Sequence, residues 1–195
     1  GIVHRIDKGT SGVLVIAKTD DAHLHLSNQF KQHSVKRQYQ CLVWGVPGKK
    51  HGVVKAALGR HPARRKDISI IENDDSEENE KKKGKSAVTH WRLLQSFEFA
   101  ALLACRLETG RTHQIRVHLT SIGHPLIGDP QYGKSPLKQL SGISTELSQT
   151  LTNFKRQALH AEILGFEHPV SGEWLEFKAP FPDDYKILLK AIQHD

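Results

Sequence analysis

Hydrophobic residues in this chain gather in short runs and periodic stretches that predict alternating strands and helices. Residues 12–17 (GVLVIA) are apolar after the glycine, which predicts a buried strand. Residues 20–33 carry apolar positions at helical spacing, with Asp20 or Asp21 as the expected N-cap. The apolar face of this helix is formed by Ala22, Leu26 and Phe30. The chain is therefore expected to begin with a strand and a helix.

The middle of the chain is predicted to be mostly sheet. Residues 35–44 alternate and are rich in residues that favour strands, and residues 53–59 form a shorter run of the same kind. Residues 87–94 and 101–107 are expected to form a pair of strands. Residues 61–84 are polar, charged and poor in hydrophobic residues, which predicts a long flexible loop between strands.

The C-terminal half adds helices and a further pair of strands. Residues 112–122 predict a short helix that Gly123 ends, whereas residues 135–154 suggest a variable loop and a helix. Residues 158–166 and 173–178 are expected to pair as strands around a turn. A closing amphipathic helix is predicted over 183–192.

Together these elements predict an α+β fold. The expected architecture is a mixed, largely antiparallel sheet flanked by helices, in one domain covering residues 1–195. With 195 residues and 37% hydrophobic content, the chain is long enough for one sizeable core. No apolar segment is long enough to cross a membrane. Cys41 and Cys105 lie in strand-like apolar surroundings that suit buried reduced thiols, with a disulfide as the alternative.

The charge of the chain favours a polyanionic partner. The formal net charge is +7 and the isoelectric point is about 9.4. Residues 72–85 contain six acids and four lysines, so the remaining residues carry +9. The acidic part of this segment is expected to be a solvated connection, while its lysines are candidates for contact with a polyanion.

Two short stretches far apart in the sequence carry the candidate chemistry. Residues 4–12 read H-R-I-D-K-G-T-S-G, and residues 109–118 read T-G-R-T-H-Q-I-R-V-H. They supply one carboxylate, Asp7, and one guanidinium, Arg116, that a fold can bring together. Asp7 precedes the predicted first strand, which is a rigid place for a reactive group. In isolation Asp7 reads as a turn or capping residue and Arg116 as a surface helix residue.

The first stretch resembles the RluA-type pseudouridine synthases, in which an H-R-L/I-D segment precedes a T-S-G strand. Three other segments, residues 36–39, 123–130 and 157–161, also look like family segments in family order. The likeness is greatest to the branch that modifies large-subunit ribosomal RNA. Since the chain contains no methionine, we expect its start to have been removed, together with the N-terminal strands that this family has.

The resemblance implies that the chain converts specific uridines of RNA to pseudouridine on a flipped-out nucleotide. Asp7 matches the catalytic aspartate, which can either attack C1′ or take a proton from C2′; the sequence leaves both open. Arg116 matches the arginine that pairs with it. Tyr39 matches the tyrosine against the base, with a plain core tyrosine as the rival reading.

Other residues are implied to bind RNA. Arg5 resembles the arginine that fills the gap left by the flipped nucleotide, and a phosphate contact is its alternative. Arg111 is a second candidate partner for Asp7, but is expected to bind phosphate or brace its loop. His113 and Gln114 are expected to brace the site by hydrogen bonds. Candidate phosphate contacts, any of which could simply be solvated, are Lys8, Lys18, Arg37, Arg60, Arg64, Arg65 and Lys66.

The sequence offers no motif for a metal or nucleotide cofactor. His113 and His118 lie about 140° apart on a helix of roughly 3.6 residues per turn, and neither zinc-type spacing nor a P-loop occurs. The expected partner is RNA, in particular large-subunit ribosomal RNA. The protein is expected to be a monomer and to act in the cytoplasm or in an organelle. The alternatives are a non-catalytic RNA-binding or ribosome-assembly module and a glycosidase-like hydrolase, which usually needs two carboxylates.

Overall fold

The computed structural model describes residues 1–64, 66–71, 84–133, 136 and 140–195. These residues form eight strands and four helices. In chain order they are β1 Ser11–Gly12, α1 Asp20–Gln32, β2 Lys36–Trp44, β3 His51–Arg60, β4 Ile68–Ile70, β5 Lys85–Ser96, β6 Ala100–Leu107, α2 Gln114–Ser121, α3 Thr145–Asn153, β7 Leu159–Glu167, β8 Trp174–Lys178 and α4 Asp183–His194.

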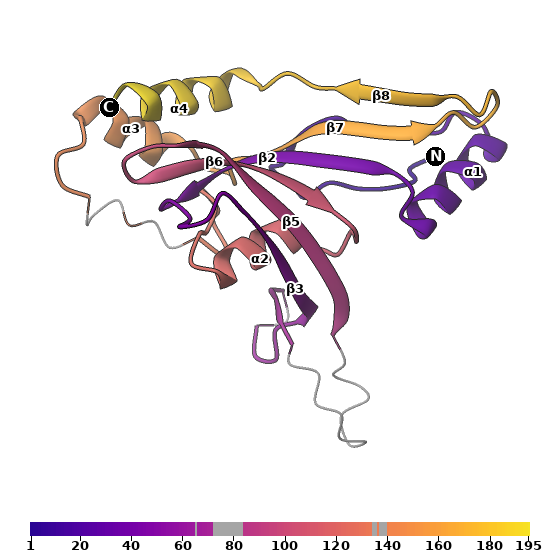
Figure 1. Ribbon diagram of the computed structural model, residues 1–195, viewed down its shortest axis with the longest axis horizontal. Coiled ribbons are helices and arrows are strands. Elements are labelled where there is room, and N and C mark those ends of the chain that lie inside the picture. The colour runs from indigo at the N-terminus through magenta and orange to yellow at the C-terminus, as the bar shows by residue number, and fades with distance from the viewer. Residues whose placement is uncertain (65, 72–83, 134–135, 137–139) are drawn as a thin grey trace.

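All the strands belong to one sheet, which runs β1-β7-β2-β6-β5-β3-β4, with β8 also paired to β7. Only the β1–β7 pairing is parallel among these strands, and the other pairings are antiparallel. The predicted α+β class with a mixed, largely antiparallel sheet is therefore confirmed. Figure 1 shows α3 and α4 at one end of the sheet, α1 at the other, and α2 beneath its middle.

The central strands β2 and β6 bury both faces, because side chains alternate across a strand and helices cover both sides. Leu42 and Trp44 pack on the side of α3 and α4, together with the fully buried Tyr185. Cys41 and Val43 pack on the side of α2. The strand β2, which was predicted from alternation over residues 35–44, thus separates two layers of core. The sheet and α2 therefore form a rigid frame for residues at their junction.

The strand predicted over residues 12–17 is wrong for most of its length. The strand β1 contains only Ser11 and Gly12, and the side chain of Ile16 is 60% exposed. The strand cannot continue because the same edge of β7 is shared. The strand β1 pairs with residues 160–161 of β7, and β8 pairs with β7 from residue 163 onwards. The chain leaves the sheet after Gly12, where a side chain would collide with the backbone of Ala161.

The helix α1 forms as predicted, except for its N-cap. Leu26 is buried, and Ala22 and Phe30 pack beside it in the same cluster. The cap is Thr19, whose hydroxyl oxygen accepts a hydrogen bond from the backbone of Ala22 at 3.2 Å. The expected cap at Asp20 or Asp21 is wrong, because both acids lie in the first turn, where they favour the helix dipole.

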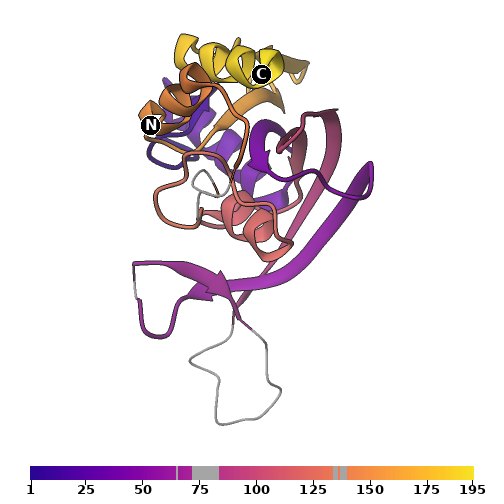
Figure 2. The same cartoon turned by 90° about the vertical axis from the view of Figure 1, so that its left-hand side faces the viewer.

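The predicted loop 61–84 contains a strand that the sequence analysis missed. The three residues of β4 pair with the end of β3, so part of this segment is a hairpin. A strand this short shows no clear alternation, and its last residue, Ile70, is 37% exposed. The ends of β3 and β5, with β4, extend from the body as an arm (Figure 2). Arg65 and residues 72–83, including Lys81, Lys82 and Lys83, lie outside the described residues.

The other elements follow the sequence analysis, with ends that differ by a few residues. The pairs β5–β6 and β7–β8 are antiparallel, and α2 and α4 form as helices. Cys41 and Cys105 are buried free thiols with their sulfur atoms 3.8 Å apart. In the described part of the chain, no helix has the length and apolar content that a membrane span requires.

Candidate active site

Asp7 lies in a turn that leads into β1. The backbone amide of Thr10 donates to the carbonyl oxygen of Asp7 at 2.9 Å, which closes the turn. The segment before β7 holds this turn from the side, because Gln157 donates to the carbonyl of Lys8 at 2.8 Å and Arg156 to that of Gly9 at 3.0 Å. These bonds fix the backbone around Asp7 and leave its side chain 17% exposed.

The partner of Asp7 comes from α2. Nη1 of Arg116 lies 3.5 Å from Oδ2 of Asp7, so the fold brings together the two groups singled out in the sequence. The side chain of Arg116 is only 5% exposed. The pair has the geometry of a carboxylate held beside a buried positive charge.

Asp129 holds Arg116 in place. Its carboxylate accepts Nε at 2.7 Å and Nη2 at 2.9 Å, a bidentate arrangement. The amides of Gln131 and Tyr132 donate to the same carboxylate at 2.9 Å and 3.1 Å. Burial alone would raise the pKa of Asp129, but the hydrogen bonds from Arg116, Gln131 and Tyr132 outweigh it and lower that pKa below its usual value.

Arg116 is correspondingly kept charged. Burial would lower the pKa of its guanidinium, but the hydrogen bond and charge of Asp129, followed by the charge of Asp7, raise it. The aromatic ring of Tyr132 lies 4.8 Å from the guanidinium carbon, a cation–π contact. Asp129, Gln131 and Tyr132 were not assigned a role from the sequence. The G-D-P segment was the available signal, because an aspartate beside a tight turn often accepts backbone hydrogen bonds.

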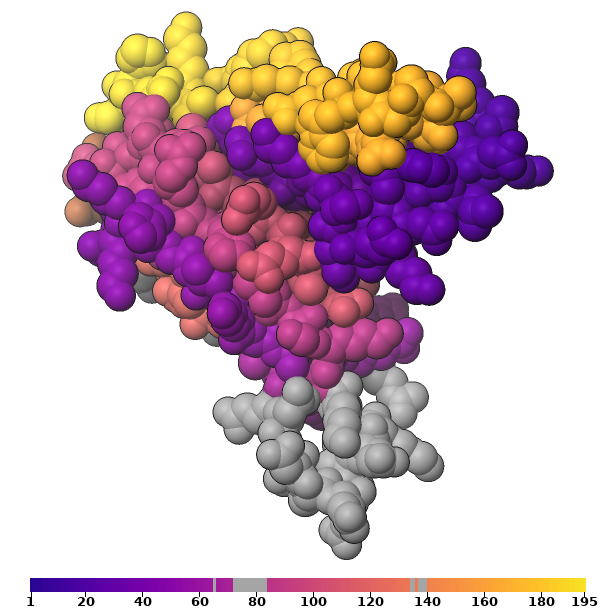
Figure 3. Space-filling model, turned by 45° about the vertical axis from the view of Figure 1, so that its right-hand side comes forward, coloured from indigo at the N-terminus to yellow at the C-terminus, as the bar shows by residue number. Residues whose placement is uncertain are grey.

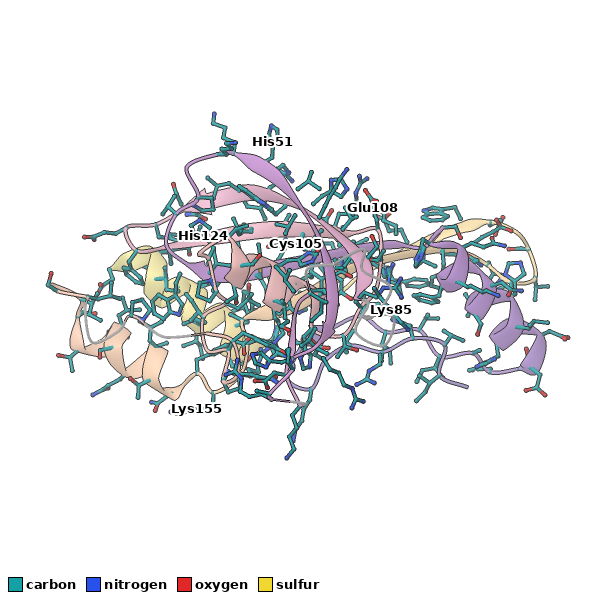
Figure 4. All side chains as sticks on the ribbon, turned by 90° about the horizontal axis from the view of Figure 1, so that it is seen from below. His51, Lys85, Cys105, Glu108, His124 and Lys155 are labelled. Carbon is teal, nitrogen blue, oxygen red and sulfur yellow. The ribbon has the colours of Figure 1, made fainter. Side chains whose placement is uncertain are left out.

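Tyr39 enters the same site from β2. It lies opposite Cys105 of β6 in the sheet, and Figure 4 marks Cys105 within the group of strands. Pairing of β2 with β7 shifts register between Gln38 and Tyr39. Burial raises the pKa of the Tyr39 hydroxyl, the charge of Arg37 opposes this, and the charge of Asp7 adds to it. Tyr39 is therefore a neutral phenol close to Arg37 and Asp7.

A cavity of about 550 Å³ lies beside Asp7 and Tyr39. It is lined by Asp7 and Tyr39 and, among the other residues singled out in the sequence, by Arg5, Arg37, Arg111, His113 and Gln114. Figure 3 shows that the N-terminal part of the chain, in indigo, lies beside the middle part of the chain, in pink, on one face of the molecule. Lys8 is exposed and is not among the lining residues, so its contact with RNA stays a prediction.

Arg37 is an unusual part of the cavity wall. Its side chain is 91% buried, yet Nε and Nη2 have no hydrogen-bond partner among the described residues. Burial lowers the pKa of Arg37. Burial, together with the charge of Arg37, lowers the pKa of His4 to about 4. A side chain at Gly110 would collide with the Arg37 guanidinium. The cavity wall thus contains a buried guanidinium that forms no ion pair within the part of the chain that the structure describes.

Gln114 and Arg111 are tied to the sheet. The side-chain oxygen of Gln114 accepts from Thr109 at 2.7 Å and from the amide of Arg111 at 3.0 Å. Its amide group donates to the carbonyl of Val88 at 2.9 Å and to the hydroxyl of Thr89 at 3.0 Å. These bonds occupy Gln114 within the protein, which fits a brace better than a contact with RNA. Arg111 donates through Nε to the carbonyl of Ser86 at 3.2 Å.

The cavity places one carboxylate, that of Asp7, among basic residues that include Arg5, Arg37 and Arg111. A sequence model of the family described as RNA pseudouridylate synthase matches residues 1–121. The chain therefore belongs to the RNA pseudouridylate synthase family.

Curated relatives extend this assignment. The chain is 48% identical over 192 residues to a protein of Zymomonas mobilis named ribosomal large subunit pseudouridine synthase D, covering 98% of this chain and 56% of that protein. A protein of the same name from Nitrosomonas europaea is 48% identical over 194 residues, covering 100% and 52%. The chain thus spans about half the length of these relatives.

A solved structure supports the fold independently. The human RNA pseudouridylate synthase domain containing 4 superimposes with a TM-score of 0.78 at 24% sequence identity. The match covers 98% of this chain and 75% of the human one. The sheet and helices described above are therefore the arrangement seen in that human protein.

Proposed function

We propose that the protein converts uridine to pseudouridine in RNA and that its substrate is large-subunit ribosomal RNA. The observation that carries this proposal is that Asp7 lines one cavity with Tyr39 and has its Oδ2 3.5 Å from Nη1 of Arg116. Membership of the family supports the reaction, and the names of the curated relatives support the substrate.

Asp7 is the proposed catalytic residue. The isomerisation breaks the bond from N1 of uracil to C1′ of ribose and forms a bond from C5 to C1′, so every atom stays in the product. An ionised carboxylate serves this reaction either as a nucleophile at C1′ or as a base at C2′. Arg116 places a positive charge beside the carboxylate for either route, with Nη1 3.5 Å from Oδ2 of Asp7.

Tyr39 is proposed to hold the uracil. The cavity of about 550 Å³ falls in the range of small-molecule sites, and a nucleotide must leave its stack to reach Asp7. An aromatic ring on a rigid strand offers a surface for stacking. Because Tyr39 is kept as a neutral phenol, its hydroxyl can also donate a hydrogen bond to a base or assist proton movement at C5.

The basic residues around the cavity are proposed to hold the RNA backbone. Arg5 is exposed next to Asp7, where it can fill the gap left by the flipped nucleotide. Arg37 and Arg111 line the cavity and place positive charge at its wall. Phosphate contacts of this kind position RNA without reading its sequence. We propose that the protein acts as a cytoplasmic monomer without a metal or nucleotide cofactor.

A hydrolytic reaction is less well supported. Glycosidases use two carboxylates that flank the scissile bond. In the described part of the chain, the second carboxylate near Arg116 is Asp129, whose side chain is 1% exposed and hydrogen-bonded to Arg116 and two backbone amides. Asp129 is therefore a structural partner of Arg116 and has no access to a substrate.

The proposal is tested by mapping pseudouridine in unmodified large-subunit ribosomal RNA after incubation with this chain and with the protein extended to the full length of its relatives. Pseudouridine at defined positions with either form supports the proposal. Release of free uracil would show hydrolysis instead. RNA binding without any product from either form would favour a non-catalytic binding module, and the proposal would fail.

A further inference from the structure

Tyr132 joins three parts of the site that are far apart in the sequence. Its hydroxyl oxygen lies 2.8 Å from the backbone nitrogen of Ile68 on β4 and 2.7 Å from Nδ1 of His113. Its ring lies 4.8 Å from the guanidinium carbon of Arg116. One side chain therefore contacts the β3–β4 hairpin, the start of α2 and the arginine that pairs with Asp7.

The hydrogen bonds of the Tyr132 hydroxyl have a direction. A backbone N–H can only donate, so the hydroxyl oxygen accepts from Ile68. The hydroxyl then has a single proton to give, and its other partner among the described residues is Nδ1 of His113. The arrangement in which every group is satisfied has Nδ1 of His113 as an acceptor. The ring proton of His113 is then on Nε2.

The backbone of His113 supports a role for its ring. His113 has φ of 55°, a left-handed conformation that non-glycine residues rarely adopt. It occupies the N-cap position of α2, but its side chain makes no capping hydrogen bond. The ring instead packs edge-on against Tyr132, with centroids 5.5 Å apart, and lines the cavity. A strained residue at a helix start that does not cap the helix is typical of a functional position.

The charges around His113 leave the ring neutral. Burial lowers the pKa of His113 most, and Arg116 and Arg5 lower it further, whereas Asp7 and Asp129 oppose this. A neutral ring has one donor and one acceptor nitrogen. Because Tyr132 occupies the acceptor, Nε2 presents the donor, and this nitrogen has no hydrogen-bond partner within the described residues.

We propose that Tyr132 is a positioning residue that fixes His113 as a hydrogen-bond donor, through Nε2–H, to an oxygen of the nucleotide bound beside Asp7. Uracil carbonyls, ribose hydroxyls and phosphates all offer such acceptors. The proposal rests on the proposed function for the identity of the ligand. The tautomer and its dependence on Tyr132 are properties of the free protein, so they are testable without any reaction.

The first experiment reads the tautomer directly. Nitrogen-15 NMR of the histidine rings is recorded near pH 7 for the wild type, Tyr132→Phe and Tyr185→Phe, with His113 assigned from the signal lost in His113→Gln. We expect a single Nε2–H tautomer in the wild type and in Tyr185→Phe, whose altered ring lies elsewhere in the core. In Tyr132→Phe we expect a mixture of tautomers. An Nδ1–H tautomer in the wild type, or an unchanged tautomer in Tyr132→Phe, would overturn the proposal.

The second experiment tests the donor with RNA. A glutamine amide nitrogen can replace Nε2–H, whereas alanine cannot, and both variants place a non-glycine residue at the same φ. We expect kcat/KM to fall about tenfold in His113→Ala, the effect of one lost hydrogen bond of ordinary strength, and to stay within about threefold in His113→Gln. Equal losses in both would overturn the donor role. Absence of product with the wild type would instead overturn the proposed function, while the NMR result would still decide the tautomer.

Discussion

Arg116 is bound more closely by Asp129 than by Asp7. Two of its nitrogens lie 2.7 Å and 2.9 Å from the carboxylate of Asp129, whereas Nη1 lies 3.5 Å from Asp7. The bidentate contact fixes the plane of the guanidinium and directs the remaining nitrogen toward Asp7. Asp7 is thus left with a nearby positive charge but without the tight contacts that would tie it down. This division of roles separates the structural carboxylate from the proposed catalytic one.

Replacing Asp129 should destabilise the protein strongly. In Asp129→Asn the buried Arg116 loses its charge partner, and we expect the free energy of unfolding to fall by about 3 to 5 kcal/mol in denaturant titrations. The control is Asp184→Asn, because the Asp184–Arg156 pair has 51% exposure at its carboxylate. That change should cost about 1 kcal/mol or less. Similar losses in the two variants would contradict the role of Asp129.

The same residue predicts a pH dependence. The folded state lowers the pKa of Asp129 below its ordinary value of 3.8, so its contribution to stability is present above that value and is lost as pH falls through the lower, folded pKa. The stability difference between the wild type and Asp129→Asn should therefore shrink in strongly acidic solution. Denaturant titrations from pH 3 to pH 7 test this. A difference that grows toward acid pH would have the wrong sign.

Replacing Arg116 should reduce turnover, and the reduction should be larger when both its charge and its hydrogen bonds are lost than when only the hydrogen bonds are lost. Lysine keeps the positive charge but not the fork that binds Asp129 and Gln131, so Arg116→Lys should be impaired less than Arg116→Ala. We expect alanine to lower kcat by about a hundredfold or more, which is typical for loss of a charged group that supports a reacting centre. Single-turnover assays measure it. Equal activity in all three proteins would remove Arg116 from the site.

A Cβ atom at Gly110 would meet the end of the Arg37 side chain, so the guanidinium, which is buried, would have to move. We expect Gly110→Ala to lower the free energy of unfolding by about 1 to 3 kcal/mol, the usual cost of overpacking. Gly48→Ala is the control, since nothing lies within 4 Å of a Cβ atom at that position. Its effect should stay within about 0.5 kcal/mol. Thermal unfolding of both variants compares them, and an unchanged Gly110→Ala would show that Arg37 is free to move.

His4 should titrate far below an ordinary histidine. Burial, aided by the charge of Arg37, lowers its pKa to about 4. Histidine NMR titration should therefore show a midpoint near pH 4, and Arg37→Gln should raise it. Since the folded pKa is below the ordinary 6.5, the neutral ring stabilises the fold above pH 6.5, and this contribution is lost between pH 6.5 and 4. A midpoint near 6.5 would contradict the burial of His4 beside Arg37.

The sequence predicts Asp7 and Arg116 better than it predicts the residues that hold Arg116 in place. Asp7 and Arg116 lie in segments with a recognisable order, and the fold brings them together. Helical spacing predicts α1, because this helix buries one face. The strand-forming residues of 35–44 predict β2, although β2 buries side chains on both of its faces. The run 12–17 misleads, since an apolar composition does not reveal that β8 occupies the edge of β7. The roles of Asp129 and Tyr132 depend on contacts across the fold, which no local pattern contains.

The most direct test of the account compares the wild type with Asp7→Asn on large-subunit ribosomal RNA at equal occupancy of the RNA. Asparagine has nearly the same shape as aspartate but can neither attack C1′ as an anion nor accept a proton from C2′. The account predicts pseudouridine with the wild type, none above background with Asp7→Asn, and unchanged RNA binding and thermal stability. Substantial pseudouridine formed by Asp7→Asn would contradict it.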